Sequence, residues 1–257
     1  MTTRLPHAQN FAAELDKELF ARLSTGPITG VRPKRAATLI LIDRSGPAPK
    51  VLMGLRHAGH KFMPGKFVFP GGRLEPTDRL MSPMTLLASQ TQSQLMACMH
   101  RPTLAGAKAV ALAAIRETFE ETGLLLGTKT SAPIHDAPPG VWQDFAKHGV
   151  RPSLAEIHFI GRAITPPRNK MRFDAHFLAA DASAIAKRIE GVVGPDSELV
   201  ELKWVTVPEA LNLGLVPITR TILRELENRV ALGFGRELPV PSYRFTVKGW
   251  VRSLMQA

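Results

Sequence analysis

The sequence has one cysteine and no long apolar run among its 257 residues. A single cysteine, Cys98, cannot form a disulfide within the chain, which excludes the small secreted proteins that disulfides hold together. No stretch approaches the roughly 20 consecutive apolar residues that cross a membrane, and no apolar signal core follows Met1. The sequence therefore favours a reducing, cytoplasmic location with no membrane partner.

Acidic residues are fewer than basic ones, 22 against 33, and the formal net charge is +11. A positive surface raises the local concentration of anionic substrates, and it would attract nucleic acid equally well. The basic residues form no run of five or six, however, and the few aromatic residues do not stand beside them as a stacking platform for single strands. We expect a small anionic substrate and regard nucleic acid as an unlikely main ligand.

Short β-rich runs alternate with helical patterns along the chain, which predicts an α/β fold. The hydrophobic fraction of 44% and the chain length fit one large globular domain. The expected strands cover residues 36–43, 51–55, 67–69, 157–164, 172–179 and 199–207. The expected helices cover residues 9–24, 83–99, 107–121, 208–213 and 218–232.

The run from Arg116 to Leu124 carries the most chemical information. Its three carboxylates, Glu117, Glu120 and Glu121, are spaced i, i+3 and i+4 and share one face of a helix within an arc of about 100°. Like charges at this spacing repel one another, and a divalent cation such as Mg²⁺, which takes oxygen ligands, reverses the effect. A solvated acidic helix face is the alternative interpretation.

This run resembles the second half of the Nudix box, the signature of Nudix hydrolases, G-x5-E-x7-R-E-U-x-E-E-x-G-U with U apolar. The matching residues are Arg116, Glu117, Glu120, Glu121, Gly123 and Leu124, and Thr118 stands at an apolar position. The segment 67–75 resembles the first half of the box, and Gly72 would be the first glycine of the box. Asp78 stands where the family pattern has glutamate.

The spacing between the two halves departs from the family pattern. Residues 79–115, which number 115 − 78 = 37, stand where the pattern has seven. Such an insertion is tolerable because loop closure costs grow slowly with length. Its position is similar to that in the Nudix branch of the acyl-CoA diphosphatases, and the segments 56–72 and 172–177 also resemble that branch. We hypothesise that the Met and Leu side chains of the insertion form a wall that selects the acyl-pantetheine arm.

The resemblance implies a Nudix αβα sandwich with a mixed central sheet, formed by a single domain over residues 1–257. It also implies an N-terminal extension over residues 1–32 with a helix, a helical insertion over about 79–108 and a C-terminal helical region over about 208–257. Many Nudix hydrolases form homodimers, so a homodimer is a further expectation.

The implied activity is metal-dependent hydrolysis of CoA or acyl-CoA to 3′,5′-ADP and (acyl-)4′-phosphopantetheine, with Mg²⁺ or Mn²⁺ as cofactor. Glu117, Glu120, Glu121 and the backbone carbonyl of Gly71 would hold the metal. Glu120, Glu121 and Arg116 would be catalytic, and Arg116 would orient the glutamates through a salt bridge to Asp78 or Glu75. The expected substrate-binding residues are Arg56, His60, Lys61, Lys66, Gly72 and Arg172.

Several alternatives stay open at this point. The substrate could be another dinucleotide, such as ADP-ribose, NADH or a capped RNA end, or the chain could be a non-catalytic Nudix-fold sensor or nucleic-acid-binding protein. The basic loop before the glycine turn could be only a solvated loop, and Arg172 could simply pair with Asp174. Glu198 and Glu201 could assist the metal or the base, although solvation at a strand edge is the simpler role for both.

Overall fold

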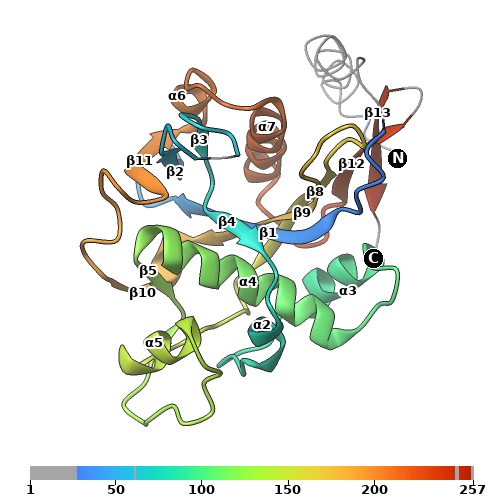
Figure 1. Cartoon of the computed structure of the whole chain (residues 1–257). Coiled ribbons are helices and arrows are strands. Elements are labelled where there is room, and N and C mark those ends of the chain that lie inside the picture. Colours follow the sequence, from blue (N-terminus) through green and yellow to red (C-terminus); the bar gives the residue numbers. More distant parts are fainter. Residues whose placement is uncertain (1–27, 61, 247–248, 256–257) are drawn as a thin grey trace.

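The computed structural model describes residues 28–60, 62–246 and 249–255, so the helix expected over residues 9–24 lies outside the described part. A mixed sheet with the strand order β11-β2-β1-β9-β8-β12-β13 forms the centre of the molecule (Figure 1). Its strands are β1 (Lys34–Asp43), β2 (Lys50–Arg56), β8 (His158–Ile164), β9 (Phe173–Asp181), β11 (Leu199–Thr206), β12 (Val240–Thr246) and β13 (Gly249–Met255). Two short strands, β3 (Phe67–Val68) and β4 (Gly71–Arg73), pair with β2 and β1.

The sheet is mixed because β1 runs parallel to β9 and β12 runs parallel to β8, whereas the other pairs are antiparallel. Helices cover both faces, as the predicted sandwich requires (Figure 1). One layer holds α2 (Pro76–Leu80), α3 (Ser89–Ala97), α4 (Leu104–Thr122) and α5 (Val141–Lys147), and the other holds α6 (Val207–Leu211) and α7 (Pro217–Ala231). Short two-stranded sheets join β5 (Leu124–Leu126) to β10 (Ile185–Arg188) and β6 (Thr128–Lys129) to β7 (Val150–Arg151).

The core has two parts because β1 is buried on both faces. Leu39 and Leu41 belong to the cluster on the side of α4, and Ile40 and Ile42 belong to the cluster on the side of α7. Successive side chains of a strand point to opposite faces, so one nearly continuous apolar run serves both layers.

The central helix α4 is bounded by two residues that end its hydrogen-bond pattern. The hydroxyl of Thr103 accepts a hydrogen bond from the amide of Gly106 at 3.0 Å, which caps the first turn. Gly123 adopts a left-handed conformation with φ 74°, and a Cβ there would collide with the carbonyl oxygen of Ile189. The helix predicted over residues 107–121 is thus confirmed with slightly wider bounds.

The insertion is helical over a shorter segment than predicted. A helix was expected over residues 83–99, but α3 begins at Ser89 because the preceding segment pairs with a distant part of the chain. The amide of Met84 donates to the carbonyl of Pro152 at 2.7 Å, and Thr85 forms a β-bridge with Ser153. This tertiary pairing holds the first part of the insertion in an extended conformation.

Three apolar side chains of the insertion contribute to the core and do not line a substrate wall. Met81 and Leu95 are fully buried and Met99 nearly so, in the same cluster as the inner face of α4. Met99 lies against Gly106 near the start of α4, whereas Glu117 is eleven residues, or about 16 Å, further along the helix. The hypothesis of a selective wall is wrong for these three side chains.

The expectation of a helical C-terminal region is wrong beyond α7. β12 and β13 pair as an antiparallel hairpin, which extends the central sheet past β8. The carboxylate of Glu225 on α7 accepts hydrogen bonds from the hydroxyl of Tyr243 and from the guanidinium of Arg252, and this buried network fastens the hairpin to the helix layer. Within the described residues, no helix is both long and apolar enough to cross a membrane.

If the insertion is a structural part of the core, Leu95→Ala should lower the free energy of unfolding by about 3 kcal/mol, because it leaves a cavity at a fully buried position. Leu86→Ala is the matched control in the same insertion, since Leu86 is 69% exposed, and it should change stability by less than about 0.5 kcal/mol. Urea unfolding of both variants makes the comparison. Equal effects would contradict a structural role for α3.

Candidate active site

Arg116 is the centre of the candidate site, and it is 2% exposed. Its guanidinium donates to both carboxylate oxygens of Asp78, from Nε at 2.8 Å and from Nη2 at 3.2 Å. Nη1 donates to Glu117 at 3.0 Å and to Glu120 at 2.6 Å, and Nη2 also donates to the carbonyl of Arg73 at 2.7 Å. The planar fork of one arginine therefore fixes two of the three glutamates on α4.

Asp78 is fully buried and has two roles. Besides accepting from Arg116, its carboxylate accepts from the backbone amide of Glu75 at 2.8 Å and completes a capping box at the start of α2. Of the two partners expected for Arg116, the structure shows Asp78 and not Glu75. The short helix α2 packs against α4, so the shorter aspartate reaches the arginine from a position where the family pattern has glutamate.

The glycine turn lies against two carboxylates of the helix face, those of Glu117 and Glu121. The amide of Gly71 donates to Glu121 at 3.2 Å. A Cβ on Gly72 would lie 2.5 Å from the carboxylate of Glu117, so any other residue there would displace that carboxylate. Both glycines are held in place because β4 pairs with β1, with Thr38 opposite Gly71. The structure thus brings the two halves of the sequence motif together despite the insertion between them.

A second arginine approaches the same carboxylates from β2. Arg56 is 7% exposed, and its guanidinium lies 3.8 Å from Glu121 and 2.5 Å from Glu198. His60 lies 3.4 Å from the same carboxylate of Glu198. Glu198 therefore belongs to the candidate site, whereas Glu201 pairs with Lys203 at 3.0 Å, outside this cluster.

The sequence offered only a weak signal for Glu198. Solvation at a strand edge was the simpler interpretation, and the side chain is indeed 43% exposed. What distinguishes it is the strand register, since Leu199 is the partner of Arg56 at the end of β11. That pairing can be known only once the fold is known.

The carboxylates of this site are held at high electrostatic cost. Burial raises the pKa of Glu117 to about 7, against the opposing effect of Arg116. Burial and the charge of Glu198 raise the pKa of Glu121 well above its usual range, although Arg56 acts in the opposite direction. Burial also raises the pKa of Glu120. Desolvated carboxylates with raised pKa values are typical of functional sites.

Two of the expected substrate-binding residues, Arg172 and Lys66, have no described side-chain contact with the glutamates. The guanidinium of Arg172 donates to the carbonyls of Thr165 and Val31, and it does not pair with Asp174, which binds Arg162 instead. The ammonium of Lys66 lies close to Gly214, before α7, where a Cβ on Gly214 would be 3.8 Å from it. Lys61 lies outside the described residues.

The oxygen donors present suit a hard divalent cation. In the described part of the chain, no three His, Cys, Asp or Glu side chains are arranged closely enough to enclose a metal ion as they stand, because Arg116 and Arg56 engage the carboxylates directly. The fit rests on the donor set, in which Glu117 and Glu121 are desolvated and adjacent to the open backbone of Gly71 and Gly72.

Comparisons with known proteins bear on the family and the fold. The family model described as NUDIX domain matches residues 32–226. A NUDIX hydrolase from Alicyclobacillus acidocaldarius superposes with a TM-score of 0.58 at 26% identity, over 76% of this chain and 91% of that one. The NUDIX domain of Shewanella oneidensis NrtR, solved with ADP ribose, has a TM-score of 0.44 at 13% identity over 83% of this chain and 99% of its own.

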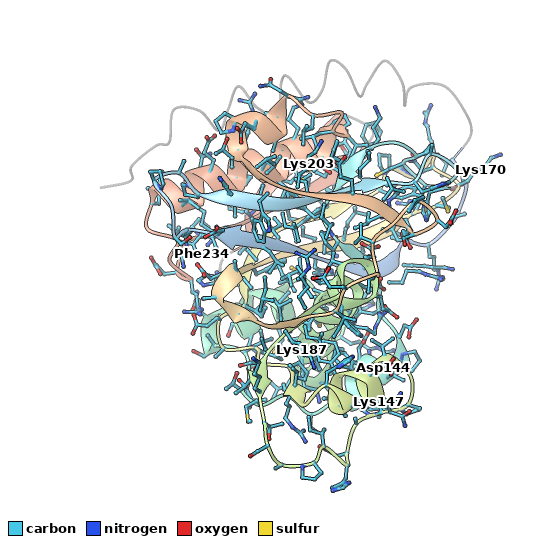
Figure 2. The ribbon with its side chains drawn as sticks, turned by 90° about the vertical axis from the view of Figure 1, so that its left-hand side faces the viewer. Asp144, Lys147, Lys170, Lys187, Lys203 and Phe234 are labelled. Carbon is cyan, nitrogen blue, oxygen red and sulfur yellow. The ribbon has the colours of Figure 1, made fainter. Side chains whose placement is uncertain are left out.

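If the buried pair of Asp78 and Arg116 organises the site, Asp78→Asn should lower the free energy of unfolding by about 3 kcal/mol, because it leaves Arg116 without its main counterion. Asp144→Asn is the control: Asp144 pairs with Lys147 at the surface (Figure 2), and its loss should cost less than about 0.5 kcal/mol. Thermal or urea unfolding distinguishes the two. A cost for Asp78→Asn as small as the control would contradict the role of the pair.

The raised pKa of Glu117 predicts a pH dependence of stability in the absence of metal. The contribution of Glu117 to the free energy of unfolding is fully present below pH 4.5. It is lost as the pH rises through about 7, because the folded state must then hold a buried charge. The difference in unfolding free energy between wild type and Glu117→Gln should therefore fall by roughly 2 to 3 kcal/mol between pH 4.5 and 7.5 in EDTA. A difference that does not change with pH would contradict the burial of this charge.

Proposed function

Because the chain belongs to the Nudix family, we propose that it is a metal-dependent diphosphatase whose substrate is CoA or an acyl-CoA. The products would be 3′,5′-ADP and (acyl-)4′-phosphopantetheine. The observation that carries the hydrolytic part of this proposal is the joining of the Gly71–Gly72 turn to Glu117 and Glu121 across an insertion of 30 extra residues.

The residues that would hold Mg²⁺ or Mn²⁺ are Glu117, Glu120, Glu121 and the backbone carbonyl of Gly71. When bound, the metal neutralises charge on the diphosphate oxygens and makes the attacking water more acidic. Its charge would also offset the desolvation that raises the pKa values of the buried glutamates. This reciprocal stabilisation explains why carboxylates are gathered where burial disfavours their charged form.

Each other residue of the site has a role that its contacts support. Arg116 positions Glu117 and Glu120 through Nη1, while Asp78 fixes Arg116. Glu198 is the candidate to accept the proton of the attacking water. It is more exposed than Glu121, and its charge is close enough to raise the pKa of Glu121. Arg56 and His60 position Glu198 and are suitably placed to meet a substrate phosphate.

The proposal that the substrate is CoA rests on a resemblance and on charge, whereas the proposal of diphosphate hydrolysis rests on the geometry of the carboxylates. The insertion between Asp78 and Arg116 and the segment 56–72 resemble the acyl-CoA diphosphatase branch, and the surplus of basic residues suits a polyanionic substrate. The buried insertion does not by itself supply an acyl-binding wall. A second class of substrate, such as ADP-ribose or NADH, would use the same carboxylates, so activity measurements must separate them.

We expect the purified protein with Mg²⁺ or Mn²⁺ to hydrolyse CoA esters with a higher kcat/KM than ADP-ribose, NADH or capped RNA. In Glu120→Gln and Glu121→Gln, kcat should fall by about two orders of magnitude or more, because each change removes a charged oxygen donor from the metal face. Product analysis by chromatography would identify 3′,5′-ADP.

The control is Glu201→Gln, which removes a carboxylate that pairs with Lys203 outside the candidate site. Its kcat should stay within twofold of wild type. A preference for ADP-ribose would overturn the choice of CoA but leave the diphosphatase intact. Full activity of both Glu120→Gln and Glu121→Gln would overturn the metal assignment as well.

A further inference from the structure

Two segments far apart in the sequence are basic and contain no acidic residue. Residues 28–35 include Arg32, Lys34 and Arg35, and residues 165–172 include Arg168, Lys170 and Arg172. The six positive charges contribute more than half of the net charge of +11 from sixteen residues. Such a concentration raises the local potential toward anions.

Hydrogen bonds hold these two segments against each other. The amide of Thr29 donates to the carbonyl of Pro167 at 3.0 Å, and its hydroxyl donates to the same carbonyl at 2.8 Å. The guanidinium of Arg172 donates to Val31 at 2.6 Å, and the amide of Lys34 donates to the carbonyl of Arg172 at 2.9 Å. Arg172 is therefore a structural residue that keeps the other cations together.

Three of the cations have no charged partner in the described part of the chain. Arg32, Lys34 and Lys170 are exposed and form no ion pair with a described residue. Figure 2 shows Lys170 pointing away from the body of the protein. We call these three residues the basic edge.

Two carboxylates stand near the basic edge, and neither neutralises it. Asp174, opposite Arg35 in the sheet, binds Arg162 through two hydrogen bonds of 2.6 and 2.7 Å. The carboxylate of Glu75 accepts from the backbone amide of Asp78 in the capping box of α2 and forms no ion pair with a described residue. Among the described residues, no carboxylate forms an ion pair with the basic edge.

The basic edge lies next to the candidate active site. Thr38 is the partner of Gly71, and Lys34 precedes Thr38 by four residues, or about 13 Å along the strand. The loop that follows Arg56 also links the two places: His60 contacts Glu198, and Phe62 packs edge-to-face on Phe173 with ring centroids 5.3 Å apart. Phe173 is itself the partner of Lys34.

We propose that the basic edge binds a phosphomonoester that the substrate carries apart from the scissile diphosphate. This inference rests on the proposed function, and it narrows the substrate class to nucleoside diphosphate derivatives with an additional phosphate, such as the 3′-phosphate of CoA. The three side chains are long and flexible, so together they can reach a phosphate on a substrate whose diphosphate lies at Glu117 and Glu121.

The test compares Arg32→Gln/Lys34→Gln/Lys170→Gln with a control that loses the same charge elsewhere on the surface, Lys50→Gln/Arg101→Gln/Lys129→Gln. Lys50 stands opposite Asp43 at the far end of β1. Calorimetry measures the binding of adenosine 3′,5′-bisphosphate and of adenosine 5′-phosphate, and kinetics measure KM for CoA and 3′-dephospho-CoA.

We expect the basic-edge variant to bind the bisphosphate about tenfold or more weakly and to show a similar rise in KM for CoA. Its affinity for adenosine 5′-phosphate and its KM for 3′-dephospho-CoA should not change. The control variant should match wild type with all four compounds. Equal behaviour of the two variants, or equal losses with and without the 3′-phosphate, would overturn the inference. Preferential loss of a short RNA oligonucleotide would instead assign the surface to nucleic acid and also overturn it.

These outcomes separate the inference from the proposed function. If wild type hydrolyses CoA but the basic-edge variant behaves like the control, the function stands and the inference fails. If wild type does not hydrolyse CoA, and only the basic-edge variant loses binding of the bisphosphate, the choice of CoA fails and the site for an additional phosphate stands.

Discussion

The buried contact between Arg116 and Asp78 is the interaction on which the candidate site depends. It joins α2 to α4 and closes the loop formed by residues 79–115. Extending that loop from seven residues to 37 adds only about 1.5 kcal/mol of closure entropy. The burial of Leu95 and Met81 against α4 contributes more than that, at roughly 2 kcal/mol for each side chain. The split motif can therefore reassemble because its insertion adds to the core.

The candidate site and the chain as a whole have net charges of opposite sign. Five carboxylates, those of Asp78, Glu117, Glu120, Glu121 and Glu198, surround two arginines, so the site has a surplus of three negative charges when all are ionised. The chain as a whole carries +11. A local negative surplus favours a cation, and a positive surrounding surface favours an anionic substrate. Diphosphate hydrolysis with a divalent metal requires both at one place.

The sequence allowed the prediction of those parts that local patterns determine. The glutamate face, the terminating glycine and the buried strands follow from periodicity and backbone chemistry, and the structure confirms their placement. The extended start of the insertion could not be predicted because it depends on Pro152 and Ser153, far away in the sequence. The C-terminal hairpin was missed because Pro239 precedes β12 and Pro241 lies within it, and proline is unusual in a strand. Glu198 was underrated because its proximity to Arg56 arises from strand register alone.

We expect substrate selectivity to arise outside the carboxylate face, in the loop that follows Arg56. The carboxylate face belongs to a single helix and its glycine turn, and such a face can serve any diphosphate. The neighbouring loop takes a left-handed conformation at Met63, with φ 56°, immediately before Pro64, and backbone strain of this kind persists only where surrounding contacts hold it. Phe62 supplies such a contact on Phe173. The loop thus connects Glu198 to the basic edge. Under our proposal, a substrate that contacts both ends of the loop carries its second anionic group at a matching distance from the diphosphate.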